Sequence, residues 1–237
     1  MQVGETIERP KSLTKMVIDR LRDSIIDGSI DLGAHLSENR IAELFGTSKT
    51  PVREAFAHLQ TLGLMEIQAQ RGGIVFAPTL EQVRELCEVR LELEVIAFRL
   101  SMERNYSALI HSLAQIVTKM IEVYDVELPL PYQRLDNEFH NTAFTHCGNS
   151  LLAQAYALFN PRICALRTHL STPQPYLLKR SFEEHKMILA FAEKRDADSV
   201  VLVLKEHINR TRECHSSLLL NRAPPSNTFT VDRAGKL

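Results

Sequence analysis

Closely spaced cysteines are missing from the 237-residue sequence. Its four cysteines lie far apart and form no Cys-x-x-Cys pair, which argues against a zinc knuckle or a redox pair. In a reducing compartment such cysteines are expected to be free and mostly buried thiols. The four positions are Cys87, Cys147, Cys164 and Cys214.

Long apolar runs are missing as well. No stretch of about 18 apolar residues occurs, so we expect no membrane span and no membrane partner. The segment from Met1 to Pro10 is polar and lacks the apolar stretch of a secretory signal. The sequence therefore predicts a cytoplasmic protein.

An excess of positive charge is also absent. The chain has 28 Lys and Arg against 29 Asp and Glu, a formal net charge of −1. The overall charge thus gives no indication of nucleic-acid binding, and a DNA-binding surface would depend on where a few cations lie. The apolar share of 44% is ordinary for a globular protein, and the length suffices for one large domain or two modest ones.

The first third of the chain combines short helical patterns with a hairpin pattern. Apolar residues spaced by four predict a helix over 13–27 with Ser12 as its N-cap. Ser37 and Gly46 bracket a second helix. A third helix opens near Ser48 after a tight turn. The hairpin pattern consists of a strand at 65–69, a glycine turn at 70–73 and a second strand at 74–77.

After Pro78 the patterns are helical throughout. We expect a mainly α protein in which a winged helix-turn-helix precedes an antiparallel all-α bundle. The predicted helices are Thr79–Arg104, Tyr106–Val123, Pro131–His146, Ser150–His169, Pro175–Lys194 and Ala197–Leu220. The predicted parts are an N-terminal arm (1–11), the winged helix-turn-helix (12–78), a helical metal-binding, effector-binding and dimerisation domain (79–222) and a disordered tail (223–237).

Two short helices, a tight turn and a hairpin are the order of a winged helix-turn-helix, whose second helix enters the major groove by its N-terminal end. Lys49 and Arg53 are four residues apart on the predicted outward face and can donate to phosphates or to guanine. Ser48 and Thr50 add hydroxyl groups at the helix N-terminus. Arg71 lies at the hairpin tip, beside Gly72. The alternative interpretation is that these cations are solvated charges on an ordinary helical bundle.

The stretch from Leu36 to Phe56, LSENRIAELFGTSKTPVREAF, resembles the signature of the GntR family of regulators. The family typically has arginine where this chain has Lys49, leucine where it has Phe56, and an arginine on the preceding helix where Asn39 stands beside Arg40. A lysine gives up bidentate geometry. The resemblance implies contacts with an operator. The candidate DNA-binding residues are Asn39, Arg40, Ser48, Lys49, Thr50, Arg53, Arg71 and Gly72.

Asp136 and His140 share one face of a predicted helix because they are four residues apart. Together with His185 and His207 they are a donor set that suits Zn²⁺, Ni²⁺ or Mn²⁺ with open positions for water or a ligand. Taken without a family, each histidine is more often an ordinary core or surface residue than a metal ligand. We assign the ordinary role to the remaining ones, His35, His58, His111, His146, His169 and His215.

The spacing Asp-x-x-x-His, followed by Glu-His-x-x-Ile-Leu and a final His-Ile, is similar to the metal motif of the FCD-type C-terminal domain of the FadR subfamily. The resemblance implies a divalent metal held by Asp136, His140, His185 and His207. Arg90 and Glu94, on the long first helix of this part, form either a surface pair or an inward arginine that binds an effector carboxylate. Arg162 and Arg167 are weaker candidates for the same task.

These features predict a homodimeric repressor that binds a pseudo-palindromic operator and senses a small organic acid at its metal. Movement at the metal would reach the DNA-binding heads through the helix after Pro78. Two alternatives stay open: a metal-dependent hydrolytic enzyme, and a DNA-binding protein whose metal is purely structural.

Overall fold

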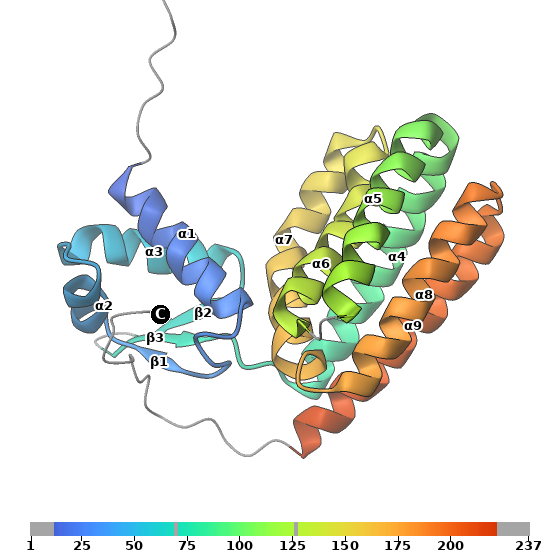
Figure 1. The fold of residues 1–237 in the computed structure, drawn as a ribbon. Helices are drawn as coiled ribbons and strands as arrows, with labels where there is room; N and C mark the ends of the chain where they lie inside the picture. Colours follow the sequence, from blue (N-terminus) through green and yellow to red (C-terminus); the bar gives the residue numbers. More distant parts are fainter. Residues whose placement is uncertain (1–11, 69–70, 126–127, 222–237) are drawn as a thin grey trace, which may run out of the picture.

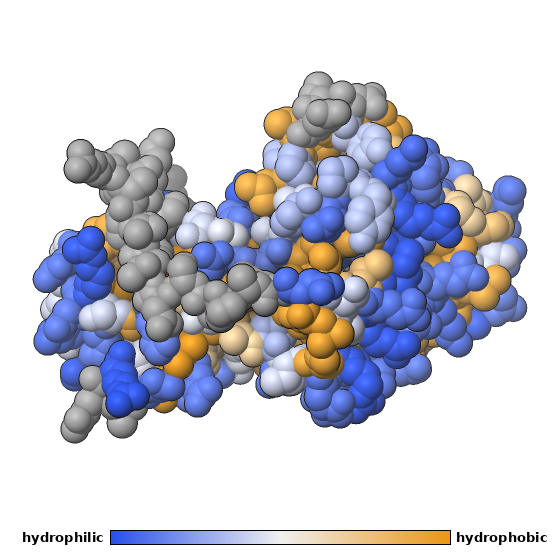
Figure 2. Space-filling view, turned by 90° about the horizontal axis from the view of Figure 1, so that it is seen from below, coloured by the Kyte–Doolittle hydropathy of each residue, from blue (hydrophilic) through white to orange (hydrophobic). Residues whose placement is uncertain are grey.

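A computed structural model describes residues 12–68, 71–125 and 128–221. They form a small winged-helix part and a larger helical part that lie side by side (Figure 1). The predicted N-terminal arm and disordered tail lie outside the described residues. Hydrophilic residues make up most of the visible surface of the helical part when it is seen from below (Figure 2). Over the described ranges, no helix has both the length and the apolar character that crossing a bilayer requires.

The winged-helix part contains the predicted helices and hairpin, and it adds one short strand. Its strands form an antiparallel sheet in the order β1-β3-β2, with Leu36 opposite Gly73 and Glu66 opposite Ile74. The elements are α1 (Leu13–Ile26), β1 (His35–Leu36), α2 (Glu38–Leu44), α3 (Lys49–Thr61), β2 (Met65–Gln68) and β3 (Gly72–Val75).

Local chemistry fixes the ends of these helices. The Ser12 side chain accepts a hydrogen bond from the backbone of Lys15, as an N-cap should. Gly63 follows α3 with a φ of +64°, a left-handed conformation that glycine adopts without strain. The predicted inward stripe of α3 is buried and packs against α1. Its members are Val52, Ala55, Phe56 and Leu59.

The helical part contains six α-helices and a short π-helix among the described residues. A capping box between Thr79 and Gln82 starts the first of them directly after Pro78. The elements are α4 (Leu80–Arg104), α5 (Tyr106–Asp125), α6 (Pro129–His146), α7 (Ser150–Leu166), η1 (Arg167–Ser171), α8 (Pro175–Glu193) and α9 (Ala197–Leu220). Ser150–His169, predicted as one helix, is thus an α-helix that widens into a π-turn over its last residues.

α4 and α6 pack against each other, and each buries one face in the bundle. α4 contacts α5, α6, α7 and α9, whereas α5 contacts α4, α6 and α8. Phe98 of α4 and Phe139 of α6 are fully buried, with ring centroids 6.4 Å apart. Polar side chains on the inward faces of α4 and α6 are consequently shielded from water.

The two parts touch through the C-terminal end of α1. A ring nitrogen of His169, in η1, lies 2.9 Å from the carbonyl oxygen of Ile25. Arg134 of α6 forms a 2.6 Å ion pair with Asp27, the residue that follows α1. Any β-carbon at Gly28 would lie 3.4 Å from the side chain of Thr168. The end of α1 is therefore packed against η1 and α6.

Candidate metal centre and nucleic-acid interface

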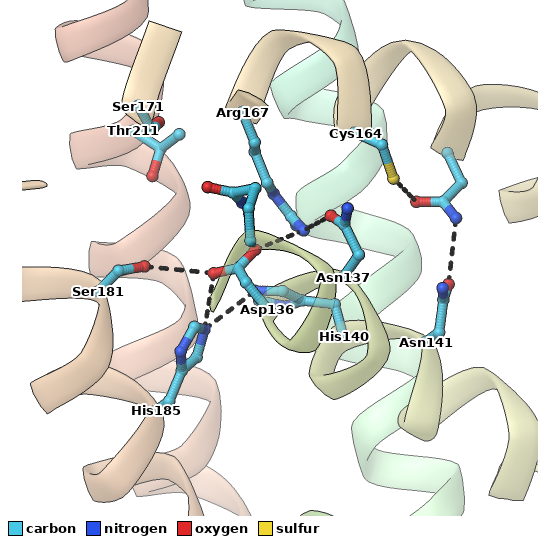
Figure 3. A network of polar contacts seen from close by, with 12 residues as sticks. Asp136, Asn137, His140, Asn141, Cys164, Arg167, Ser171, Ser181, His185 and Thr211 are labelled. Atoms are coloured by element: carbon cyan, nitrogen blue, oxygen red, sulfur yellow. Dashed lines mark hydrogen bonds and ion pairs between the residues drawn. The ribbon is translucent and has the colours of Figure 1, made fainter. Parts of the chain in front are cut away.

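The four predicted metal-binding residues come together in the middle of the helical bundle. Asp136 and His140 lie on α6, His185 on α8 and His207 on α9. All four are buried, and one ligand atom of each lies within 4.8 Å of the others. The Nε2 atom of His185 is 3.3 Å from Nε2 of His140 and 3.4 Å from Oδ1 of Asp136 (Figure 3). The remaining histidines lie outside this cluster.

The Nδ1 atom of each clustered histidine contacts an oxygen outside the cluster. These contacts join His140 to Glu94 (2.7 Å), His207 to Glu184 (2.8 Å) and His185 to the hydroxyl group of Tyr132 (3.3 Å). Histidines that bind metals commonly hold their second nitrogen in this way, because the contact fixes the ring and its tautomer. All three rings are therefore oriented to offer Nε2 to a shared ion.

Charge states in the cluster suit a cation. Burial lowers the pKa of His185 to about 3 and also lowers the pKa of His140 and His207, so these rings are neutral at neutral pH. Burial alone would raise the pKa of Asp136, but the positive charge of Arg167 outweighs it and holds that pKa below its ordinary value. Three neutral imidazoles and a carboxylate are the ligand forms that divalent metals require.

A small cavity borders the cluster. It is lined by Asp136, Arg167 and His207 among others, and it has about 20 Å³ of free space. This volume is enough for about one water molecule. The donor set, the oriented rings and this space fit a divalent ion that keeps one position open, as in the prediction of Zn²⁺, Ni²⁺ or Mn²⁺.

Arg90 lies inside the bundle and is paired there. Its exposed fraction is 1%, and its Nε donates to Glu94 Oε1 over 2.7 Å. Its Nη2 lies 3.0 Å from Nε2 of His140. The two sequence interpretations thus each describe half of the arrangement, since Arg90 points inward and also pairs with Glu94.

Arg167 has more unused hydrogen-bonding capacity than Arg90. Its Nη1 lies 2.7 Å from Oδ2 of Asp136 and 2.6 Å from the side-chain oxygen of Asn137. Its Nε and Nη2 are buried without a hydrogen-bond partner, and Glu94 Oε1 is 3.9 Å from Nη2. Arg162, by contrast, packs against Gly63 of the winged-helix part. Of the two arginines at the metal centre, Arg90 and Arg167, it is therefore Arg167 that has unpartnered donors to offer a ligand.

Sequence reasoning did not assign roles to Glu184 or Tyr132. Glu184 accepts hydrogen bonds from His207 and from Arg210. Burial alone would raise the pKa of Glu184, but these hydrogen bonds outweigh it and lower the pKa to about 2. The sequence signal for Glu184 was its position beside His185. Tyr132 carries no such signal, because its contact with His185 arises only from the packing of α6 against α8.

The predicted DNA-binding residues gather on the surface of the winged-helix part. Seven of them are exposed, and Gly72 is partly buried. Lys49 opens α3, and Arg53 lies one turn further on. The exposed residues are Asn39, Arg40, Ser48, Lys49, Thr50, Arg53 and Arg71. The surface therefore offers cations at the N-terminal end of α3, the end by which a recognition helix enters the major groove.

Arg53 and Gly72 each have a contact within the protein that the sequence did not reveal. Arg53 Nε lies 2.6 Å from Glu38 Oε2, although the Arg53 side chain is 66% exposed. Gly72 has a φ of +91°, and a β-carbon there would come within 2.2 Å of the carbonyl oxygen of Leu36. The close pairing of β1 with β3 thus requires glycine at this position, whatever it does with DNA.

Comparisons with known proteins agree with this architecture. Residues 13–75 match the family described as bacterial regulatory proteins, gntR family, and residues 85–210 match the FCD domain. The "Probable D-xylose utilization operon transcriptional repressor" of Paenarthrobacter nicotinovorans is 29% identical over 84% of this chain and 88% of its own length. The gluconate operon transcriptional repressor of Bacillus subtilis is 27% identical over 71% of this chain and 68% of its own length.

A solved structure shows the same fold at lower identity. The Escherichia coli protein McbR/YncC superposes with a TM-score of 0.74, covers 85% of this chain and 95% of its own, and is 22% identical. At this identity the likeness concerns the fold alone. It supports the arrangement of a winged helix-turn-helix followed by a helical domain.

Proposed function

The chain belongs to the GntR family of bacterial regulatory proteins, with an FCD domain after its winged helix-turn-helix, and from this premise we propose that a small organic acid bound at a metal sets its affinity for an operator. It is a transcriptional regulator of the repressor type, as its relatives are, and these relatives are not enzymes. One observation carries the proposal: four buried ligand residues beside two buried arginines.

We assign DNA contacts to the exposed cations and hydroxyl groups at the start of α3, to Asn39 and Arg40, and to the wing. Lys49 and Arg53 reach the major groove, where a side chain donates to guanine O6 and N7. Arg71 enters the neighbouring minor groove. Because Glu38 pairs with Arg53 in the free protein, DNA has to displace the Glu38 carboxylate before Arg53 can bind a base. A sequence without guanine at this position does not accept two hydrogen bonds from Arg53, so displacing Glu38 stabilises that complex less.

Asp136, His140, His185 and His207 would hold the metal, which supplies a Lewis-acid site for a carboxylate oxygen when it is bound. Arg90 currently donates to His140 Nε2, the atom that would bind the ion. Its Nη2 must therefore leave when the site is filled, and Glu94 keeps the guanidinium nearby. The released donor is then available to the effector's carboxylate.

The effector can act only if it favours one arrangement of the two parts over another. Two contacts between the helical part and the end of α1 would transmit a movement to the winged-helix part by a shorter route than the predicted one through α4. Arg134 and Asp136 lie two residues apart on α6, and Arg134 pairs with the end of α1. His169 also contacts α1 and is two residues from Arg167, the partner of Asp136. A shift of α6 or η1 would therefore move α1 directly.

A homodimer is supported by apolar residues that remain exposed on two neighbouring helices. Val89 and Ile96 are seven residues apart on α4, and Leu151 and Leu158 are seven apart on α7. α4 and α7 contact each other, and a hollow of about 420 Å³ between them includes Val89 and Phe159. A two-fold axis at this face would bury these residues and place two recognition helices for a pseudo-palindromic operator.

Operator selection from random DNA, followed by binding measurements with zinc and with a chelator, tests the proposal. We expect a pseudo-palindromic site, and we expect that an acid such as gluconate or octanoate changes the affinity for it only when zinc is bound. If chelation lowers the melting temperature but no acid alters operator binding, the metal is purely structural. Turnover of an acid or ester by the zinc-loaded protein would favour the enzymatic alternative instead.

A further inference from the structure

A hollow of about 350 Å³ lies at one end of the helical bundle, beside the metal centre. Its walls come from the end of α5, the start of α6, the residue after η1 and the start of α8. Most of the lining is apolar, with Val123, Pro129 and Pro175 among its residues. A volume of this size lies within the range of small-molecule sites, so the hollow has room for part of a ligand.

Two side chains are shared by the walls of this hollow and of the small cavity at the metal centre. Tyr132 and Leu178 line both spaces. Tyr132 also contacts His185 Nδ1 through its hydroxyl group. The hollow and the small cavity are therefore neighbours, and a shift of these two side chains would bring a ligand in the hollow closer to Asp136 and Arg167.

The metal end of this path is built for an anion. Arg167 is 3% exposed, and two of its nitrogens have no hydrogen-bond partner. An unsatisfied buried guanidinium is costly, and a carboxylate that accepts from both nitrogens would remove that cost. The small cavity is lined by Arg167 and has about 20 Å³ of free space, room for about one water-sized group, so its walls have to widen for a carboxylate.

Combining the apolar hollow with the buried cation, we propose that the effector is a carboxylic acid with an apolar body. Its carboxylate binds at Arg167 and the metal, and its apolar chain or ring fills the hollow beyond Tyr132 and Leu178. This inference rests on the proposed function and specifies its ligand class. A polyhydroxylated acid such as gluconate fits less well, because its hydroxyl groups would leave water for walls that offer few partners.

The binding affinities of straight-chain monocarboxylates of increasing length test whether an apolar chain fills the hollow. Butyrate, hexanoate and octanoate are titrated into the zinc-loaded full chain by calorimetry, with gluconate as the comparison. Each methylene that leaves water should strengthen binding by about threefold to fourfold. Octanoate should therefore bind more tightly than butyrate by well over tenfold, and more tightly than gluconate.

Val123→Trp and Ile121→Trp form a matched pair on α5. Val123 lines the hollow, whereas Ile121 is 43% exposed and does not line it. The first variant should weaken octanoate binding by about tenfold or more and flatten the dependence on chain length, since the indole displaces two or more methylenes. The second should leave both unchanged. Zinc uptake should be normal in each.

Two results would overturn the inference while leaving the proposed function intact. One is gluconate binding more tightly than octanoate, and the other is an equal effect of the two tryptophan variants. If the protein takes up zinc but binds none of the acids, the effector role in the proposed function fails as well. Failure to take up zinc would remove the metal from the proposal, a result that the titration of zinc alone makes visible.

Discussion

The two parts of this molecule carry their candidate functional residues in opposite ways. In the winged-helix part, Lys49 and Arg53 stand on the surface, and Arg53 has one partner in Glu38. In the helical part, Arg90 and His140 are buried and belong to one continuous polar network. DNA is a large partner that can bind only at the surface of a protein, whereas an ion or a small acid can be bound inside it.

This difference determines how each site should respond to substitution. An exposed cation can be removed with little effect on stability, because its ion pair lies in water and contributes little. A buried network is more demanding, since removing one member leaves the others unsatisfied in a medium of low polarity. The DNA-binding surface should therefore lose function without losing its fold, and the metal centre should be sensitive in both respects.

The largest effect is expected at the metal centre. His185→Ala should lower zinc affinity by more than about 100-fold, because losing a ligand costs more than losing one of the residues that orient ligands. It should also abolish the rise in melting temperature on adding zinc. Calorimetric zinc titration and thermal unfolding measure both. His111→Ala, an exposed histidine on α5, is the matched control and should behave as wild type.

Arg53→Ala should weaken specific operator binding by about 10- to 100-fold, the cost of losing a contact with a base. Its melting temperature should stay within about 2 °C of wild type, because the pair with Glu38 is exposed. Fluorescence anisotropy with operator DNA reports the loss. Arg99→Ala removes an exposed arginine from α4 and should have no effect. Wild-type affinity in the Arg53 variant would contradict the assignment of α3.

Gly72 tests whether the wing can be altered as freely as α3. Gly72→Ala should destabilise the protein by about 3 kcal/mol or more. Alanine would be strained at the positive φ of this position, and its β-carbon would also clash with the backbone of Leu36. Gly46→Ala has the same kind of strain but no atom within 4 Å of the new β-carbon, and should cost only about 1 kcal/mol. Denaturant unfolding compares the two. An equal loss of unfolding free energy in the two variants would mean that β1 moves away from the new β-carbon at little cost.

The smallest effect is expected from Glu38→Gln. The variant frees Arg53 in the unbound protein and should strengthen operator binding by up to about fivefold, the range of an exposed ion pair. Glu54→Gln on α3 is the control, because Glu54 pairs with the hydroxyl group of Thr14 rather than with a cation. Weaker binding by Glu38→Gln would indicate that Glu38 orients Arg53 for DNA instead of competing with it.

The sequence predicted the fold well where periodicity and caps act locally. The end of α6 at His146 and the bounds of α9 are as predicted, and α1, α5 and α8 end within two residues of the prediction. The start of α6 was placed at Pro131, but the helix begins at Pro129, because a first turn tolerates more than one proline. β1 was missed since two residues have no periodicity. The π-turn at Arg167 was missed since the apolar spacing does not show it.

The candidate site was predictable only in part, and the reason is physical. Asp136 and His140 were paired by helical geometry, and the resemblance added His185 and His207. Their supporting contacts join residues that are far apart in the chain, as Glu94 and His140 are. No local pattern encodes such a contact, because it depends on how α4 packs against α6. The same holds for the contact between His169 and α1.

We propose that events at the metal centre reach the DNA-binding part through the end of α1. Hydrogen–deuterium exchange at residues 23–30, with and without zinc, tests it in wild type, His169→Ala and the control His111→Ala. The amides of Asp27 and Ile30 are hydrogen-bonded to Asp23 and Ser24, so they report on this segment. We predict that zinc changes their exchange in wild type and control and changes it less in His169→Ala, in which only the contact between Arg134 and Asp27 remains, although exchange around Asp136 responds in all three. A zinc response around Asp136 with none at α1 in the wild type would contradict the account.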